Sequence, residues 1–402
     1  MNIFDFLGLL KSIYGKTPPD LEKIQRKGLL AVKIAQHYAL RIDFLDEEVC
    51  RHLAKLYRHN IHVPSEKIEP LLKTYVASSW FNEFKSFDSN PFASASIGQV
   101  HSAVLNDGSR VVVKVIKKDF KNEFLRDVRF LRRFLKFIIF FYPKLSRVFD
   151  PLGILEHIED YTLSELNLEN EIKGQELLKG IYEEYKGRHD LGRLKFHRLI
   201  PELSNQNVLV SEYIRGESFD EMLEMKKLPY ELLLELFNIH GFYMFATGKF
   251  HGDIHPGNII VDERGQFNFI DTGAISRVSN KIGRGLFRFF ESLSYYEYPE
   301  CVKRINDMAE KPISGRRYKK FETLFFELYK DFANSTVSEI SLTKKMMETI
   351  KLGVNCGMEF EKGMFSIIKS LMYLDGMVLR CNPDAVLMKD LRSFIERFKK
   401  VL

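Results

Sequence analysis

The chain has 402 residues, of which 45% are hydrophobic and 28% are charged, and its formal net charge is +6. These values predict a globular protein with a sizeable core and two or three structural units. No run of eighteen apolar residues occurs, which argues against a membrane-spanning helix. The mild basic excess permits an anionic partner such as a nucleotide or a lipid surface. The four widely spaced cysteines lack metal-type spacing and fit unpaired thiols in a reducing cytoplasm.

The first 88 residues are predicted to form a helical extension without strands. Residues 1–14 place apolar side chains at helical spacing, which predicts a helix that lies on a membrane surface or docks on its own domain. A second helix is predicted over about 21–42. Lys33 and Gln36 project from one face of that helix, a pattern that by itself is typical of a solvated surface.

A loop of small residues follows at 91–100. Small residues let the backbone approach a ligand closely, and free amides there can cradle phosphate oxygens. The candidate nucleotide contacts in this loop are Ala93, Ser94, Ala95 and Ser96.

Two apolar strands, 100–105 and 111–116, are predicted to form a hairpin next to this loop. Lys114 interrupts the second strand, where a lysine is costly without a charged partner. A small-residue loop over a hairpin with a central lysine is the layout of a kinase N-terminal lobe. The alternative is an edge strand whose lysine reaches solvent.

Residues 119–149 are predicted to be helical, and the very apolar stretch 137–142 is expected to pack in a core. Contact of this stretch with a membrane or a hydrophobic ligand is the alternative. A helix that begins at Pro151 carries Glu165 and Glu171. Because a kinase fold needs a helix glutamate to pair with the strand lysine, both glutamates are candidates.

Two further strands, 194–199 and 207–214, are predicted to pair with each other. The second strand continues into a polar connector, as expected of an interlobe hinge that contacts adenine. Glu212 and Tyr213 are the candidate adenine contacts. The rest of the chain is predicted to be mainly helical, including a helix over 362–379.

The densest cluster of chemical side chains lies in 249–273. Asp253 precedes Asn258 by five positions, and Asp271 follows Asp253 by eighteen. Phosphoryl transfer needs a carboxylate beside the attacking group and oxygen ligands for magnesium. A β-hairpin predicted over 259–270 places Asp271 at its far end. Asp253, Asn258 and Asp271 can therefore supply both the carboxylate beside the attacking group and the oxygen ligands for magnesium. The alternative is an Asp- and Gly-rich turn cluster without chemistry.

These motifs resemble the UbiB family of atypical kinase-like proteins, which is associated with isoprenoid-quinone biosynthesis and lipid metabolism. The segment 33–36 is similar to the KxGQ motif of the family, 91–100 to its alanine-rich loop, and 165–167 to its ExD motif. Segments 251–258 and 271–273 are similar to its catalytic and metal motifs. The first of these two is also similar to aminoglycoside and choline phosphotransferases, so the loop and the Lys/Gln helix select UbiB.

The resemblance implies an α+β, bilobal protein-kinase-like fold with a helical extension packed over the active site. In that scheme, 1–88 is the extension, 89–215 is the N-terminal lobe with inserted helices, and 216–402 is the helical C-terminal lobe.

The resemblance also implies roles for the candidate residues. Lys114 would pair with Glu171 and contact the nucleotide phosphates. Asp253 would be the catalytic aspartate, while Asn258 and Asp271 would hold Mg²⁺.

A regulatory group is implied as well, in which Lys33 and Gln36 fold over the active site and Glu165 is the partner of Lys33. That arrangement would obstruct a peptide substrate. The chain departs from the family pattern at Ala35, which replaces the glycine of KxGQ, and at Asn167, which replaces the aspartate of ExD.

The expected function is that of an atypical kinase-like protein with ATP and Mg²⁺ as cofactors. It would be an ATPase or a small-molecule or lipid kinase that supports ubiquinone or lipid metabolism. The expected partners are a nucleotide, a lipid or isoprenoid molecule and a peripheral membrane contact, without nucleic acid, in the cytoplasm or on the inner face of a membrane. The alternatives are a catalytically weak pseudokinase that acts as a lipid- or isoprenoid-binding scaffold, and an aminoglycoside- or choline-type phosphotransferase.

Overall fold

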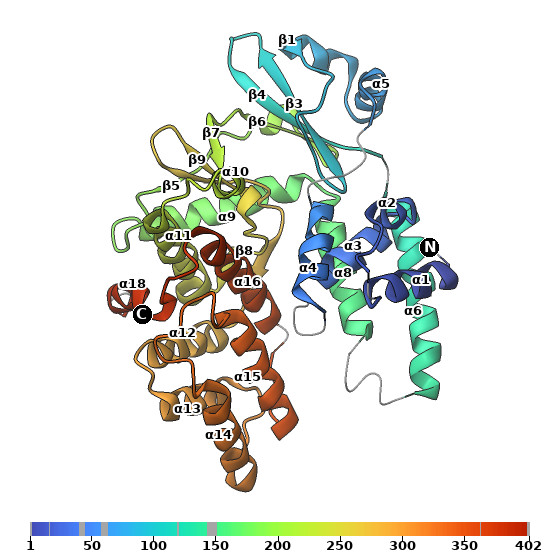
Figure 1. The fold of residues 1–402 in the computed structure, drawn as a ribbon. Coiled ribbons are helices and arrows are strands. Elements are labelled where there is room, and N and C mark those ends of the chain that lie inside the picture. Colours follow the sequence, from blue (N-terminus) through green and yellow to red (C-terminus); the bar gives the residue numbers. More distant parts are fainter. Residues whose placement is uncertain are drawn as a thin grey trace. The chain divides into compact units, whose positions relative to one another are not determined.

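The computed structural model describes residues 2–15, 17–39, 45–57, 63–118, 120–142, 151–361 and 363–399. The predicted helix limits at residues 42, 119, 149 and 362 lie outside this set. The chain divides into two compact units (Figure 1). Unit 1 is Met1–Lys173 with His197–Tyr213, and unit 2 is Gly174–Phe196 with Ile214–Leu402. Both helices and sheets are present, so the predicted α+β class is confirmed.

Unit 1 contains a five-stranded antiparallel sheet in the order β1-β3-β4-β6, with β2 paired to β3. Its strands are β1 (Phe84–Phe87), β2 (Ala93–Ser94), β3 (Gly98–Leu105), β4 (Arg110–Ile116) and β6 (Val208–Glu212). The predicted hairpin is β3 and β4, joined through Gly108 with a φ of 85°. Lys114 pairs with Val100 on one side and Leu209 on the other. Since β4 is internal, the edge-strand alternative for Lys114 is wrong.

Two strand predictions are corrected by the sheet pairings. β1 lies within the extension that was expected to have no strand, and it pairs with β3. The predicted pairing of 194–199 with 207–214 is reduced to a single bridge between Leu199 and Ser211. Each segment pairs mainly with a different strand. β6 pairs with β4, whereas β5 (Leu194–Lys195) pairs with a strand of unit 2.

The helices of unit 1 include the predicted Lys/Gln helix. They are α1 (Ile3–Ile13), α2 (Leu21–Arg26), α3 (Leu29–Ala39), α4 (Glu47–Ala54), α5 (Ser65–Tyr75), α6 (Lys121–Phe141) and α8 (Pro151–Glu165). The division between the units falls within α9 (Glu169–Tyr185). The single helix predicted from residue 21 is two helices, because Gly28 between them has a φ of 97°. A left-handed residue ends the first helix and turns the chain into the second.

Two packed regions make up the interior of unit 1. α3 contacts α1, α6 and α8, and α1 contributes the buried Leu9 and Ile13 to this region. The N-terminal helix is therefore docked on its own unit, although its Phe4 and Leu7 remain exposed. In the second region, α5 packs its Ile68 against the valines of β4.

The apolar end of α6 does not pack in a core, contrary to the expectation for 137–142. Phe137 is 63% exposed and Phe140 is 79% exposed. Their neighbours Phe141 and Tyr142 are also exposed. The buried face of α6 is the preceding one, which carries Leu131 and other apolar residues toward α3 and α8. Among the described helices, none is long and apolar enough to cross a bilayer.

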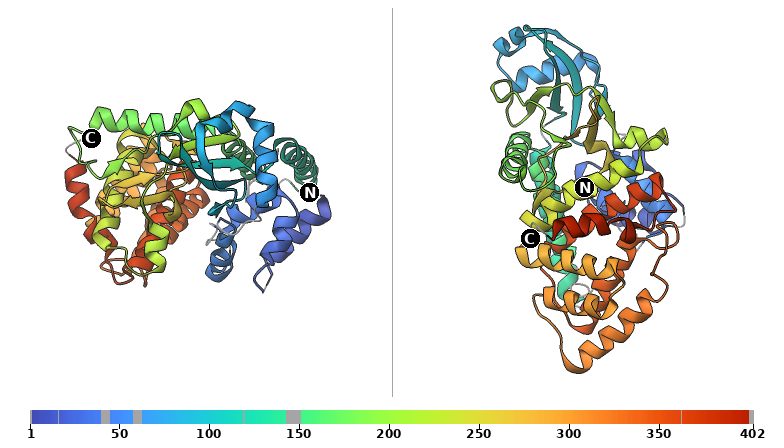
Figure 2. Two further views of the ribbon diagram at one scale, coloured as in Figure 1. Left: turned by 90° about the horizontal axis from the view of Figure 1, so that it is seen from above. Right: turned by 90° about the vertical axis from the view of Figure 1, so that its left-hand side faces the viewer.

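Unit 2 contains two small sheets and a large helical part (Figures 1 and 2). One sheet has the order β5-β10-β9-β7, with β7 (Gly216–Ser218), β9 (Ile259–Asp262) and β10 (Phe267–Phe269); the other pairs β8 (Lys249–His251) with β11 (Ile275–Arg277). The helices are α10 (Phe219–Glu224), α11 (Tyr230–Phe242), α12 (Asn280–Ser294), α13 (Tyr298–Met308), α14 (Gly315–Tyr329), α15 (Leu342–Cys356), α16 (Met364–Cys381), α17 (Leu387–Asp390) and α18 (Arg392–Phe398). One apolar core extends through this unit and includes strand residues such as Phe250 and Phe269. It fixes the strands that carry the candidate catalytic residues.

Candidate active site

Two strand ladders in unit 2 bring the candidate catalytic loop and the candidate metal loop together. The catalytic loop, 252–258, connects β8 to β9, and the metal loop, 270–274, connects β10 to β11. β8 pairs with β11 and β9 pairs with β10, with His251 opposite Ile275 and Ile259 opposite Phe269. The two loops therefore leave neighbouring strand ends. The hairpin predicted from the sequence is the β9–β10 pair.

Backbone hydrogen bonds hold the two loops against each other. The Gly252 amide donates to Ala274 O at 2.6 Å, and the Ile270 amide donates to Asn258 O at 3.0 Å. A Cβ on Gly252 would lie 2.7 Å from Ala274 O, so this approach requires glycine.

His251 adds a third link between the loops. Its Nε2 lies 2.9 Å from Ile270 O, and its Nδ1 accepts from the Asp253 amide at 3.1 Å. Complete burial lowers the pKa of His251, which favours the neutral ring. The neutral ring with its hydrogen on Nε2 satisfies both partners, so His251 ties Asp253 to the segment that precedes Asp271.

The carboxylate of Asp253 is held by two side chains from α16. Lys369 Nζ lies 2.9 Å from Asp253 Oδ1, and the Tyr373 hydroxyl donates to the same oxygen at 2.9 Å. His255 Nε2 lies 4.0 Å from Oδ2. Helix α16, labelled in Figure 1, therefore contacts the catalytic loop through these two side chains.

The sequence prediction did not include Lys369 and Tyr373. The signal that singled out Lys114 is also present here, because a lysine interrupts an apolar segment in which Ile367, Ile368 and Leu371 are buried. Such a lysine requires an acidic partner. The partner is distant in the sequence, so the pattern indicates that a partner exists but not which carboxylate it is.

Asn258 and Asp271 have the chemistry that Mg²⁺ prefers. Asn258 uses its Nδ2 to donate to Asp253 O at 3.0 Å, which directs the amide oxygen to other partners. Asp271 has a φ of 57°, an uncommon conformation for a residue other than glycine and one that recurs at functional sites. One carboxylate and one amide oxygen from the protein fit Mg²⁺, which takes its remaining oxygens from water and substrate phosphates. No group of three or more His, Cys, Asp or Glu able to hold a metal occurs among the described residues, so a metal cage made entirely of such side chains is not present there.

Within unit 2, α9 packs closely on the metal loop. A Cβ on Gly174 would lie 1.9 Å from Thr272 O, a distance no side chain can tolerate. Thr272 replaces a larger aromatic residue of the common kinase motif and is itself buried. The position of the metal loop therefore depends on a glycine in the helix that also carries Glu171.

In unit 1, the predicted partner of Lys114 is found. Lys114 Nζ lies 2.6 Å from Glu171 Oε1, and both side chains are largely buried. The sequence left Glu165 and Glu171 open as partners, and the structure selects Glu171. Contact of Lys114 with nucleotide phosphates stays a prediction.

Glu165 instead pairs with Lys33, as the family resemblance implied. Lys33 is only 7% exposed, so it does not belong to a solvated helix face. Gln36 is also buried and donates through Nε2 to Leu56 O at 3.0 Å. Ala35 between them is fully buried. This cluster is well built within unit 1, and its regulatory role stays a prediction.

The small-residue loop is partly ordered by the sheet. Ala93 and Ser94 pair with β3, and the Ala95 amide donates to Gly98 O at 2.9 Å. The side chain of Lys117 donates to Ala95 O, and burial lowers the pKa of Lys117 to about 8. A second lysine, which directly follows β4, therefore braces the candidate phosphate loop of Ala93, Ser94, Ala95 and Ser96.

Glu212 and Tyr213 lie at the end of β6, where a hinge was predicted. The Glu212 amide donates to Arg198 O at 2.8 Å, and the Tyr213 amide donates to Arg110 O at 3.0 Å. The Arg110 guanidinium also lies 4.4 Å from the centre of the Tyr213 ring. Both amides are engaged within unit 1, so an adenine here would bind to other groups of the connector.

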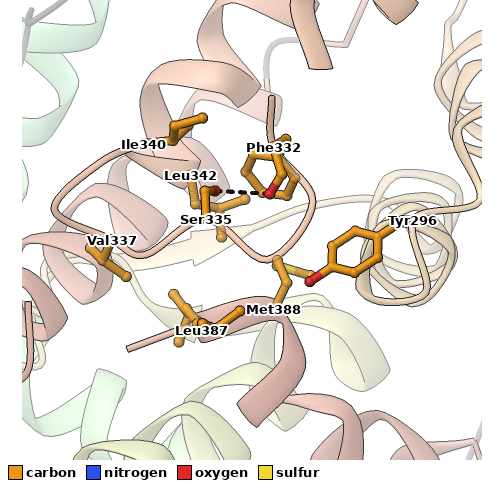
Figure 3. Close-up of a pocket in the computed structure, with 9 residues that line it drawn as sticks. Tyr296, Phe332, Ser335, Val337, Ile340, Leu342, Leu387 and Met388 are labelled. Atoms are coloured by element: carbon orange, nitrogen blue, oxygen red, sulfur yellow. Dashed lines mark hydrogen bonds between the residues drawn. The ribbon is translucent and has the colours of Figure 1, made fainter. Parts of the chain in front are cut away.

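Two hollows in unit 2 lie apart from these residues. One is lined by Tyr296, Ser335, Leu387 and neighbouring apolar residues, and its volume of about 10 Å³ is at most that of one water molecule (Figure 3). The other, of about 400 Å³, lies between α12 and α13. Neither contains a predicted site residue in its lining.

Comparison with known proteins identifies the family. A family model described as the ABC1 atypical kinase-like domain matches residues 55–305. The chain belongs to this family. The match covers both the strand lysine and the catalytic and metal loops, which confirms the resemblance stated from the motifs.

Relatives of the ABC1 family align over most of the chain. An uncharacterized protein in the hydrogenase 1 5′ region of Clostridium pasteurianum is 24% identical, over 95% of this chain and 71% of its own length. An uncharacterized chloroplastic aarF domain-containing protein kinase of Arabidopsis thaliana is 24% identical over 98% of this chain and 76% of its own. A protein of Aliivibrio fischeri named "Probable protein kinase UbiB" is 25% identical over 93% of this chain and 69% of its own.

One solved structure supports the kinase-like fold of the ABC1 family. It is Mycobacterium tuberculosis Rv3197 in complex with erythromycin, with a TM-score of 0.53 and 18% identity over 96% of this chain and 95% of that one. At this identity the similarity concerns the fold alone.

Proposed function

We propose that this protein is a magnesium-dependent, ATP-binding kinase-like enzyme that hydrolyses ATP or phosphorylates a small or lipid molecule in isoprenoid-quinone or lipid metabolism. The observation that carries the proposal is the pair of strand ladders that holds Asp253, Asn258 and Asp271 on adjacent loops. A turn cluster without chemistry would not need a buried carboxylate with two donors on one oxygen.

Each side chain has a defined task in the proposed reaction. Asp253 accepts the proton of the attacking hydroxyl or water, whose oxygen forms a bond to the terminal phosphorus while the bond to ADP breaks. Lys114, oriented by Glu171, supplies positive charge to the nucleotide phosphates. Asn258 and Asp271 would hold Mg²⁺, which neutralises phosphate charge when bound.

Two features support a lipid or other hydrophobic acceptor. The exposed aromatic end of α6, with Phe137, Phe140 and Phe141, is flanked by the exposed Arg133 and Lys136. Exposed aromatic residues beside basic residues suit the boundary of an anionic lipid surface. The UbiB family, which the motifs of this chain resemble and whose name several relatives carry, is associated with isoprenoid-quinone metabolism, which adds context for this proposal.

The test of catalysis compares the wild-type chain with Asp253→Asn. We expect magnesium-dependent ATP turnover in the wild type and a fall of about 10²–10⁴-fold in the variant. ATP should still raise the melting temperature of Asp253→Asn, which shows that the site is folded. Equal turnover in both proteins would remove Asp253 from the proposed role. Labelled ATP with anionic liposomes or phenolic quinone-like compounds then distinguishes hydrolysis from transfer.

The second candidate function is a lipid- or isoprenoid-binding scaffold without turnover, which the exposed end of α6 favours. It predicts that ATP stabilises the protein but is not consumed, with or without liposomes. It also predicts that Phe140→Ser weakens co-sedimentation with anionic liposomes, while Phe130→Ser, at an exposed phenylalanine earlier on α6, has a smaller effect.

A further inference from the structure

α16 presents two polar side chains to the catalytic loop. Lys369 and Tyr373 are four residues apart and therefore lie on the same face of the helix. The Lys369 ammonium and the Tyr373 hydroxyl each lie 2.9 Å from Asp253 Oδ1. Lys369 is 8% exposed and Asp253 is 6% exposed, so water screens this ion pair weakly.

The acidic residue on this helix, Asp375, has different partners. Asp375 accepts from the Ser341 hydroxyl at 2.6 Å and from the Thr343 amide at 3.2 Å, both at the start of α15. Asp375 therefore fixes α15 to α16, whereas Lys369 is directed to Asp253. The two buried charges of α16 have separate functions, one in joining helices and one at the candidate active site.

Convergence of two donors on one oxygen determines the orientation of the carboxylate. The planar group can rotate only by breaking the ion pair, the hydrogen bond or both. An oxygen already engaged by an ammonium group and a hydroxyl donor is a poor proton acceptor, so the role of the base falls to Oδ2, whose direction Lys369 and Tyr373 then fix.

We propose that Lys369 is a positioning residue for the reaction: with Tyr373, it orients Asp253 so that Oδ2 meets the attacking group. This proposal rests on the proposed function, because it requires Asp253 to be the base. It adds helix α16 to the residues that position the candidate base. Loss of the lysine is expected to affect the chemical step and not nucleotide affinity, since Lys369 acts through Asp253.

The test uses the full-length chain and four variants. Lys369→Met keeps the length of the side chain and removes its charge, Lys369→Arg keeps the charge, and Tyr373→Phe removes one hydroxyl. Lys345→Met is the matched control, because Lys345 is a half-buried lysine of α15 that donates to Leu328 O at 2.8 Å. For each protein, kcat and KM for magnesium-ATP hydrolysis are measured together with the shift in melting temperature caused by ATP.

The proposal predicts that Lys369→Met lowers kcat by up to about 100-fold while KM changes little. Lys369→Arg should recover part of that loss, Tyr373→Phe should show a smaller fall in kcat, and Lys345→Met should match the wild type. Wild-type kcat in a folded Lys369→Met protein would overturn the proposal, as would an equal loss in Lys345→Met.

If Lys369→Met does not fold, the kcat and KM of Tyr373→Phe test the positioning role instead. A lower kcat at unchanged KM supports the positioning role, and an unchanged kcat rejects it. Absence of turnover in the wild type is a different result, because it rejects the proposed function itself and the positioning role with it.

Discussion

Lys114 and Glu171 are 57 positions apart in the sequence, and their side chains meet at 2.6 Å within unit 1. The lysine lies in the middle of the sheet and the glutamate lies in the first turn of α9. The pair therefore holds the strand lysine against the first turn of α9.

Removal of the Glu171 charge should weaken nucleotide binding. In Glu171→Gln, Lys114 loses a charge-assisted partner, and we expect magnesium-ATP affinity to fall by about 10- to 100-fold. Glu169→Gln, at an exposed position of the same helix, is the control and should bind as the wild type does. Titration calorimetry measures both, and equal affinities in the two variants would contradict the role of the pair.

Gly174 provides a sharp test of the contact between α9 and the metal loop. Gly174→Ala places a methyl group 1.9 Å from Thr272 O, so we expect a loss of at least about 1–3 kcal/mol in unfolding free energy. Gly180→Ala on the same helix meets nothing within 4 Å and should gain about 1 kcal/mol from helix propensity. Denaturant unfolding measures both changes. Similar effects at the two positions would show that the close approach is absent.

The pair between Lys33 and Glu165 should matter for the stability of unit 1. Lys33→Met leaves a partly buried carboxylate without its cation, and we expect a loss of about 3 kcal/mol. The control is Glu22→Gln, which breaks the exposed pair with Arg26 and should cause no measurable loss. The double variant Lys33→Met/Glu165→Gln should lose less unfolding free energy than the two single variants lose when their losses are added. Additive losses in chemical denaturation would argue against the pair.

His240 predicts a dependence of stability on pH. Complete burial lowers its folded-state pKa to about 3, and neither ring nitrogen has a hydrogen-bond partner among the described residues. As pH falls below about 6.5, the unfolded chain takes up a proton that the folded chain does not. Stability is therefore lost on acidification, by about 2 kcal/mol between about pH 7 and about pH 5 for this residue alone.

The measurement compares unfolding midpoints of wild type and His240→Leu at both pH values. The variant should show a smaller loss on acidification, whereas His157→Leu, at an exposed histidine, should show the wild-type loss. An identical dependence on pH in His240→Leu would mean that His240 is not the buried neutral group described here.

The local parts of the fold were predictable from the sequence. The β3–β4 and β9–β10 hairpins follow from alternating apolar residues around Asn- or Asp-containing turns with glycines at positive φ, namely Gly108 and Gly265. The closeness of the loops that carry Asp253, Asn258 and Asp271 was also predictable, because their spacing within 249–273 is short-range. The pairing of β5 with β10 was not predictable, since nothing local marks a two-residue parallel strand.

The errors have physical causes in particular residues. The aromatic end of α6 was expected to be buried, but hydrophobicity alone does not distinguish a core face from an exposed one, and Phe140 lies on the exposed side. The break at Gly28 was missed because a glycine inside a helical pattern is compatible with either continuation or termination. Lys369 was missed because its partner is 116 positions away, beyond the reach of any motif.

The proposed function requires that the protein binds magnesium-ATP, that Asp271 takes part in binding the metal, and that Lys114 contributes to nucleotide affinity. The most direct measurement is a calorimetric titration of ATP into the wild type, Lys114→Met and Asp271→Asn, each with and without magnesium. We expect magnesium-enhanced binding in the wild type, a much weaker affinity in Lys114→Met, and loss of the magnesium enhancement in Asp271→Asn. Wild-type binding that does not respond to magnesium, or binding that is unchanged in both variants, would contradict it.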